Sequence, residues 1–175
     1  MNRKNVIELC SKDLFFREMK FVIKAKSRDL YRDNINAISV IPGSIETTDG
    51  HRIHKATIDH QWAPGLYRLA MNQKTKIILI EQQGLQWPAT CKFWEPEHNV
   101  EFANLVGVNA ALRHIYSVTP INHKYLLDVL TEYDVWKFAM VEASDQRAAL
   151  LKCDSMAAII MPVKERGPDG SYGSE

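Results

Sequence analysis

Residues 37–53 read AISVIPGSIETTDGHRI, and this stretch decides how the first third of the chain folds. Two short apolar runs, 37–41 and 44–48, are separated by Pro42-Gly43, a dipeptide typical of turns. A second turn signal, Asp49-Gly50, leads into a third run, HRIHKATI (51–58). We therefore predict three antiparallel strands. Strand alternation should place Ile53, Lys55 and Thr57 on one face of the third strand and His54, Ala56 and Ile58 on the other.

A helix is predicted to precede these strands, from Lys12 to about Lys26. Ser11 is a suitable N-cap, and Asp13 would lie in the first turn, where a carboxylate is favourable. The apolar residues recur at three- and four-residue spacing and would share one face: Phe15, Phe16, Met19, Val22 and Ile23. Before the helix, the alternating run NVIELC (5–10) predicts a first strand.

The last third of the chain repeats this order of elements without repeating the residues. Asn122 can cap a helix over 123–133, and strands are predicted over 135–143, 147–153 and 156–163. The middle holds two predicted strands, 66–72 and 75–83, and a loop rich in Trp and Pro. Residues 105–118 fit either a strand followed by a helical turn or one irregular helix. We predict an α+β fold of two β-α-β-β-β half-repeats, with two helices on one face of antiparallel sheets.

The composition is that of an ordinary globular protein. The 175 residues are 46% hydrophobic and 25% charged, and the net charge of +1 excludes a polybasic nucleic-acid scavenger but allows a local basic face. The three cysteines lie far apart with no C-x-x-C pair, which argues against disulfides and a structural zinc site. Because the sequence shows neither a signal peptide nor the roughly 20 apolar residues of a membrane span, we expect a cytoplasmic protein without a membrane partner.

The stretch 37–53 resembles the first half of a domain of the bacterial DNA polymerase III beta subunit, the sliding clamp. In that family a strand pair ends in a Thr-Asp-Gly-His/Tyr-Arg-apolar signature, which residues 48–53 match position by position. The runs YLLDVL (125–130) and AAIIMPVK (157–164) resemble the last half-domain of the same family. The resemblance implies a single DNA-clamp-like domain over 1–164, with a divergent or inserted middle segment at 61–113. The tail at 165–175 is rich in Gly, Ser and charge, and we expect it to be flexible.

In this family the signature turn and the Met-Pro strand border an apolar pocket for short peptide motifs of replication proteins. The resemblance places these residues at the pocket: Thr48, Gly50, His51, Arg52, Ile53, Ile160, Met161 and Pro162. Gly50 permits close backbone approach, His51 and Arg52 can donate hydrogen bonds, and Met161 adapts to varied apolar groups. The alternative is a purely structural hairpin, in which Asp49 caps the turn and Arg52 pairs with a neighbouring carboxylate.

The predicted first helix also suggests a face for double-stranded DNA. Arg17, Lys20, Lys24 and Arg28 would form one stripe that meets phosphates without reading bases. The alternative is a solvated basic face, and the acidic residues of the second predicted helix would weaken the hold on DNA. Clamps of this family carry three domains per chain and form rings of six domains, so a ring built from this chain would need six copies.

An enzymatic function has less support in the sequence. The cluster His51, His54 and His60 could suggest a metal, but His51 and His54 have opposite parity on a strand. Cys91 lacks a partner pattern for a nucleophile, and we expect no cofactor and no metal. The aromatic residues of the middle could form a binding surface or stack on single-stranded bases, although we expect them to pin a long loop to the core: Trp62, Trp87, Phe93 and Trp94.

The leading hypothesis is a non-enzymatic processivity factor, a sliding-clamp-like protein of DNA replication or repair. It would act as a homo-oligomeric ring on DNA or as a module that binds replication or repair proteins through short peptides. The alternatives are a monomeric adaptor or decoy that binds such peptides without encircling DNA, and a small enzyme with an unrecognised site.

Overall fold

The computed structural model describes residues 5–29, 31–94, 100–130, 135–143 and 146–163. The first half contains β1 (Val6–Cys10), α1 (Phe16–Ile23), β2 (Ile38–Ile41), β3 (Ser44–Thr48) and β4 (Arg52–Thr57). The middle adds β5 (Gly65–Asn72), β6 (Lys76–Gln82) and the short α2 (Cys91–Trp94). The second half contains β7 (Ala103–Val106), α3 (Val108–Val118), α4 (His123–Val129), β8 (Val135–Ala143), β9 (Gln146–Cys153) and β10 (Met156–Ile160).

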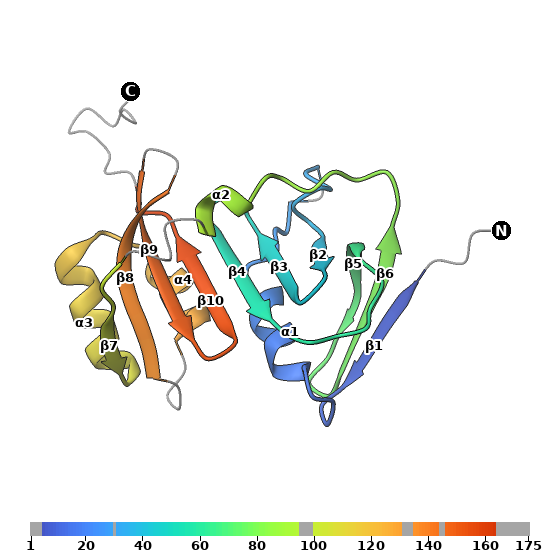
Figure 1. Ribbon diagram of the computed structural model, residues 1–175, viewed down its shortest axis with the longest axis horizontal. Helices are drawn as coiled ribbons and strands as arrows, with labels where there is room; N and C mark the ends of the chain where they lie inside the picture. The colour runs from blue at the N-terminus through green and yellow to red at the C-terminus, as the bar shows by residue number, and fades with distance from the viewer. Residues whose placement is uncertain (1–4, 30, 95–99, 131–134, 144–145, 164–175) are drawn as a thin grey trace.

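All ten strands of the described residues belong to one antiparallel sheet, in the order β1-β6-β5-β2-β3-β4-β10-β9-β8-β7 (Figure 1). The meanders β2-β3-β4 and β8-β9-β10 meet where β4 pairs with β10, in the register Ala56↔Met156 to Arg52↔Ile160. The β5-β6 hairpin separates β1 from β2, and β1 and β7 are the two edges of the sheet. The predicted α+β fold is confirmed, with one continuous sheet in place of separate sheets.

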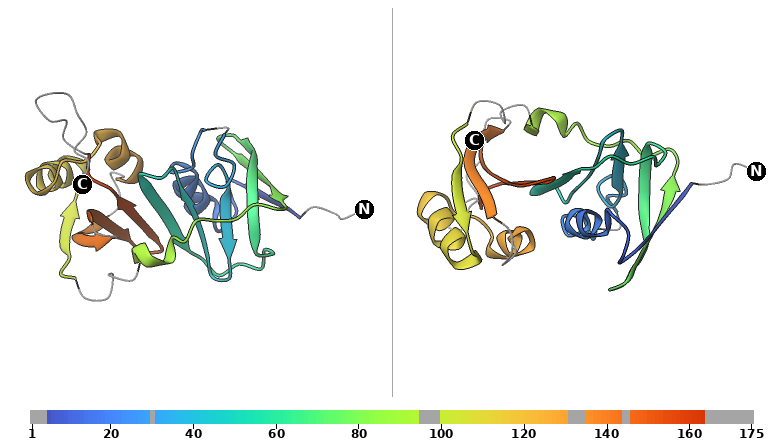
Figure 2. Two further views of the ribbon diagram at one scale, coloured as in Figure 1. Left: turned by 90° about the horizontal axis from the view of Figure 1, so that it is seen from above. Right: turned by 60° about the horizontal axis from the view of Figure 1, so that its bottom comes forward.

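The two faces of the sheet are covered differently (Figure 2). Helices α1, α3 and α4 lie on one face, which we call the helix side, and α2 lies on the opposite face, the outer side. The strand alternation of β4 sorts its residues as predicted. His54 and Ala56 face the helix side, where Ala56 joins the main core, and Ile53 faces a smaller cluster on the outer side.

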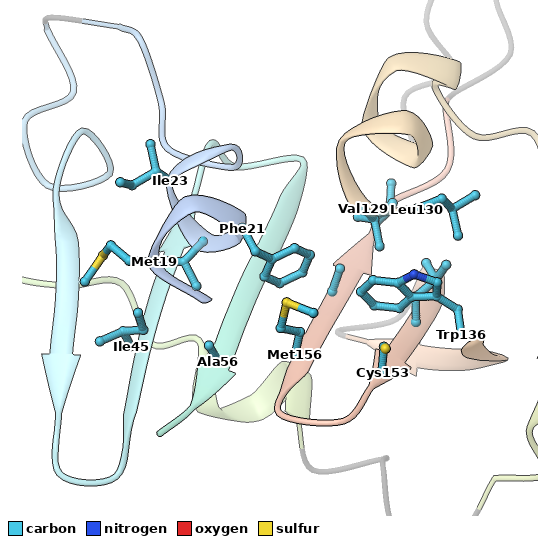
Figure 3. Close-up of a cluster of buried hydrophobic side chains, with 14 of the residues drawn as sticks. Met19, Phe21, Ile23, Ile45, Ala56, Val129, Leu130, Trp136, Cys153 and Met156 are labelled. Atoms are coloured by element: carbon cyan, nitrogen blue, oxygen red, sulfur yellow. The ribbon is translucent and has the colours of Figure 1, made fainter. Parts of the chain in front are cut away.

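The main core runs across the meeting point of the two halves. Figure 3 shows Phe21 of α1 close to Met156 of β10 and to Trp136 of β8. The ring centres of Phe21 and Trp136 lie 5.8 Å apart, and both side chains are buried in one cluster that includes residues from each of the ten strands. Burial of this apolar surface is the main force that holds the two halves together.

The helix boundaries differ from the prediction at α1. The helix begins at Phe16 because Asp13, expected in the first turn, accepts a hydrogen bond from the backbone N–H of Cys10 at 2.6 Å and stabilises a turn there. It ends at Ile23, with Lys24 as C-cap. In α4, by contrast, the predicted cap is confirmed, since Asn122 Oδ1 accepts from the Lys124 N–H at 3.0 Å. The helix ends at Val129, short of the prediction, because Leu130 has an extended conformation; positions 131–133 of the predicted helix lie outside the described residues.

The middle segment resolves the alternative left open by its sequence. Residues 103–118 form a strand and a separate helix, β7 and α3, because Gly107 takes a positive φ of 79° between them. Both strands predicted before the Trp-rich loop are present as β5 and β6. In the described part of the chain, no helix has the length and hydropathy needed to cross a bilayer.

Candidate functional site

The signature turn between β3 and β4 is held by its own side chains. The Thr48 hydroxyl accepts from the Gly50 N–H at 3.0 Å and donates to the Arg52 carbonyl at 2.7 Å. Asp49 Oδ1 accepts from the N–H groups of His51 and Arg52 at 3.0 and 3.1 Å. Gly50 has a backbone φ of 91°, a conformation that residues other than glycine rarely adopt. The Thr-Asp-Gly sequence is therefore explained by the geometry of the turn itself.

Beside this turn a pocket of about 180 Å³ opens, which we call the outer pocket. Its lining is mainly apolar and comes from four parts of the chain: Arg32, Ile35, Thr48, Gly50, His51, Arg52, Ile53, Pro88, Thr90, Phe93, Ile159 and Met161. The end of the described chain reaches the turn because the Met161 N–H donates to the His51 carbonyl at 2.9 Å. A pocket of this size can hold one or two apolar side chains.

The outer pocket brings together six of the eight residues that were predicted to line it: Thr48, Gly50, His51, Arg52, Ile53 and Met161. Ile160 does not line the pocket, because its side chain is fully buried in the main core on the helix side. Ile159, its neighbour of opposite parity, lines the pocket instead. Pro162 does not line the pocket either. Arg32, Pro88 and Phe93 were missed because their approach to the turn depends on long-range folding.

The guanidinium of Arg52 does not serve the outer pocket. Its Nε donates to Asp49 Oδ2 at 3.0 Å, its Nη1 to Asp128 Oδ2 at 2.6 Å and its Nη2 to the Lys24 carbonyl at 2.7 Å. The group also lies 4.3 Å from the centre of the Tyr125 ring, and the side chain is only 6% exposed. We call this set the Arg52 network.

The Arg52 network corrects the prediction that Arg52 donates to a peptide. Strand alternation turns its side chain to the helix side, with His54 and Ala56, so that only its other atoms can border the outer pocket. The structural alternative, with Asp49 capping the turn and Arg52 paired to carboxylates, describes these contacts. The network links β4 to α1 and α4 across the meeting point of the two halves.

His54 sits beside this network and is neutral. It is fully buried, stacks on Phe21 with ring centres 4.5 Å apart, and its Nδ1 lies 2.9 Å from the Phe21 carbonyl. Burial lowers its pKa to about 3, although the contact with the Phe21 carbonyl opposes this shift. Within the described residues, no three His, Cys, Asp or Glu side chains gather in a way that could hold a metal.

The Trp-rich segment packs on the outer side and forms one wall of the outer pocket. Buried Glu46 on β3 accepts hydrogen bonds from Trp87 Nε1 at 2.6 Å and from the Thr90 hydroxyl. Trp94 is buried in the outer cluster, and the Lys55 ammonium lies 5.3 Å from its ring centre. The prediction that these aromatic residues pin a long loop is confirmed for Trp87 and Trp94. Trp62 packs edge-on against Phe15 at 6.0 Å.

The four basic residues expected to meet DNA do not form one helical stripe. Arg17 and Lys20 lie in α1, Lys24 caps it, and Arg28 follows the helix as an exposed residue. The Lys20 ammonium donates to Asn72 Oδ1 and the Gln73 carbonyl, and that of Lys24 to the Asp128 carbonyl at 2.9 Å. Burial lowers the pKa of Lys24, the Asp128 carboxylate opposes this shift, and Arg52 adds to it.

Comparison with known proteins supports the fold. No protein-family model matches the chain, and no curated protein sequence matches it. Solved bacterial beta subunits match it in structure. That of Thermotoga maritima gives a TM-score of 0.56 at 10% identity, covering 91% of this chain and 65% of its own. That of Borrelia burgdorferi, in complex with a natural product, gives 0.60 at 11% identity, covering 94% and 64%.

The fold is that of the bacterial sliding clamp. The beta sliding clamp of C. crescentus, solved with polyethylene glycol bound, also matches, with a TM-score of 0.59 at 13% identity over 92% of this chain and 65% of its own. The chain thus spans about two thirds of the length of the beta subunits that it matches. The resemblance read from residues 48–53 and 157–164 is confirmed at the level of the fold, since the identity is too low to carry activity or partners.

Proposed function

We propose that this chain is a non-enzymatic, clamp-like protein of DNA replication or repair that binds short peptide segments in the outer pocket. The observation that carries the proposal is the joining of the two resemblance motifs at one pocket. The Thr48–Ile53 turn and the end of β10 are more than 100 residues apart in sequence, yet Met161 is hydrogen-bonded to His51. The apolar lining beside exposed polar groups is typical of peptide-binding sites.

The lining indicates the kind of peptide that would fit. Met161, Phe93 and Ile159 offer an apolar floor, and the flexible thioether of Met161 can adjust to anchors of different shape. At the rim, exposed His51 and Arg32 can donate to a peptide carbonyl or carboxylate. The expected ligand is therefore an extended segment with one or two apolar anchors next to a polar or acidic group.

A fluorescence-anisotropy titration with a labelled clamp-binding peptide tests this proposal. Met161→Asp places a carboxylate on the apolar floor and should weaken binding by about tenfold or more, because a charge would be desolvated by the anchor. Leu127→Asp is the matched control, since Leu127 is an exposed apolar residue on α4, away from the outer pocket. Equal peptide affinity of the wild type and Met161→Asp would refute the assignment of the pocket.

A ring remains the second part of the proposal. It is supported by the two ends of the sheet, where β1 and β7 present unpaired edges within the described part of the chain, and exposed Val6 and Val106 lie on them. Open edges of this kind can pair with another copy. Light scattering with and without DNA distinguishes the alternatives. A mass near six times the 20.0 kDa chain supports the ring, and a strict monomer supports a peptide-binding adaptor.

In an assembled ring, the helix side would face DNA, and Arg17, Lys20, Lys24 and Arg28 would act on phosphates. Their placement along and after α1 supports this only in part, since Lys20 and Lys24 already bind oxygen atoms of the protein. Charge reversal at Arg17 and Arg28, which are both exposed, should reduce duplex binding and its salt dependence. Unchanged binding would leave these residues as solvated surface.

A further inference from the structure

A hollow of about 590 Å³ opens on the helix side between α1, α4 and β5, and we call it the helix-side hollow. Six of its lining residues are cationic: Lys20, Lys24, Lys26, Arg28, Arg52 and Lys124. Two are acidic, Asp49 and Asp128. The hollow thus concentrates positive charge in a chain whose net charge is only +1.

The two carboxylates of the hollow are both bound to the same cation. Asp49 Oδ2 and Asp128 Oδ2 accept from Arg52 at 3.0 and 2.6 Å. In the described part of the chain, the other five cations make no ion pair with a carboxylate. Where they are bonded, their partners are neutral oxygens, as for Lys24 with the Asp128 carbonyl and Lys26 with Asn36 Oδ1 and the Ser27 carbonyl.

The electrostatic cost of this arrangement is visible at two of the lysines. Burial lowers the pKa of Lys26, and Arg68 and Arg28 lower it further. Burial also lowers the pKa of Lys24. An anion in the hollow would place a negative charge beside these ammonium groups, and its hydrogen bonds with them would be charge-assisted.

We propose that the helix-side hollow is a binding site for a free, compact polyphosphate. Its volume is that of a small-ligand site, and its cations line a concavity instead of a ridge. Lys124 and Arg28 are exposed and come from different elements, so that they can close on a ligand from two directions. A duplex bound along this face is already part of the proposed function, whereas the concave shape of the hollow favours a small free anion. The site lies across the sheet from the outer pocket and does not depend on peptide binding.

Isothermal titration calorimetry of the full chain with inorganic tripolyphosphate, at constant ionic strength, tests the site. Arg28→Gln and Lys124→Gln should each weaken binding by about tenfold, the effect of removing one charge-assisted hydrogen bond. Lys137→Gln is the matched control, because Lys137 is an exposed lysine on β8 outside the hollow and should leave the affinity unchanged. A second titration uses a short DNA duplex, alone and with tripolyphosphate as competitor.

The outcomes separate the sources of phosphate. Tripolyphosphate binding that the two variants weaken supports a free polyphosphate as ligand. Duplex binding alone, weakened by the same variants, overturns the polyphosphate site and leaves only the DNA face of the proposed function. Binding of neither probe, or binding that both variants leave unchanged, overturns the proposal. None of these results bears on the anisotropy titration with peptide, so the polyphosphate site and the peptide-binding function fail independently.

Discussion

Replacing Arg52 by Met should destabilise the protein strongly, although the residue lies in a motif associated with binding. Met keeps much of the side-chain volume but removes all three hydrogen bonds of the guanidinium and leaves Asp49 and Asp128 unpaired. Breaking a buried ion pair by removing one partner costs about 3–5 kcal/mol. Because the Asp49 and Asp128 side chains are 16% and 29% exposed, water offsets part of this cost. We expect a loss of about 2–4 kcal/mol.

Urea denaturation followed by circular dichroism measures this loss, which corresponds to a fall in Tm of roughly 5–15 °C for a chain of this length. The control is Arg68→Met, which breaks the pair of Arg68 with Asp33 at 3.2 Å, where both side chains are more than half exposed. Exposed pairs contribute about 0–1 kcal/mol. A double-mutant cycle with Asp128→Asn should show coupling with Arg52. If Arg52→Met cost no more than Arg68→Met, the Arg52 network would not hold the two halves together.

Two further predictions concern buried groups, and two more concern the ligand sites. The folded-state pKa of His54 is about 3, below its unfolded value of 6.5, so its contribution to stability is complete above pH 6.5 and is lost as the pH falls toward 3. Between pH 7 and pH 5, the free energy of unfolding of His54→Phe should therefore fall by about 2 kcal/mol less than that of the wild type. Urea denaturation at both pH values measures this difference. Glu46→Ala removes the acceptor of Trp87 and Thr90 and should cost about 1–3 kcal/mol, with faster amide exchange across residues 85–94; unchanged exchange would contradict the anchoring role. Met161→Asp should reduce peptide affinity, and Lys124→Gln should reduce tripolyphosphate affinity, in the titrations already described.

The features that the sequence predicts well are those set by local contacts. The turn at Asp49-Gly50 and the cap at Asn122 each depend on residues within four positions, and both occur in the structure. The parity of β4 is likewise a local property of a strand. The order of helices and strands in each half followed from such signals, and the resemblance carried by residues 48–53 supplied the architecture.

The features that the sequence predicts poorly depend on partners far along the chain. Arg52 was expected to face a peptide, but it pairs with Asp128, 76 residues away, and no local pattern reveals that contact. Ile160 was predicted at the outer pocket, but its neighbour Ile159 lines the pocket, because the resemblance identifies a segment and not which face of the strand each residue occupies. The start of α1 failed because Asp13 had a competing acceptor role that propensity does not rank.

The pairing of β4 with β10 is short, five residues on each strand, and the outer pocket lies directly over it. Any segment that binds between Ile53 and Ile159 would contact one strand from each half and link the two halves non-covalently. Binding of the segment would then also stabilise the β4–β10 pairing. A bound segment would therefore restrict motion between the two halves.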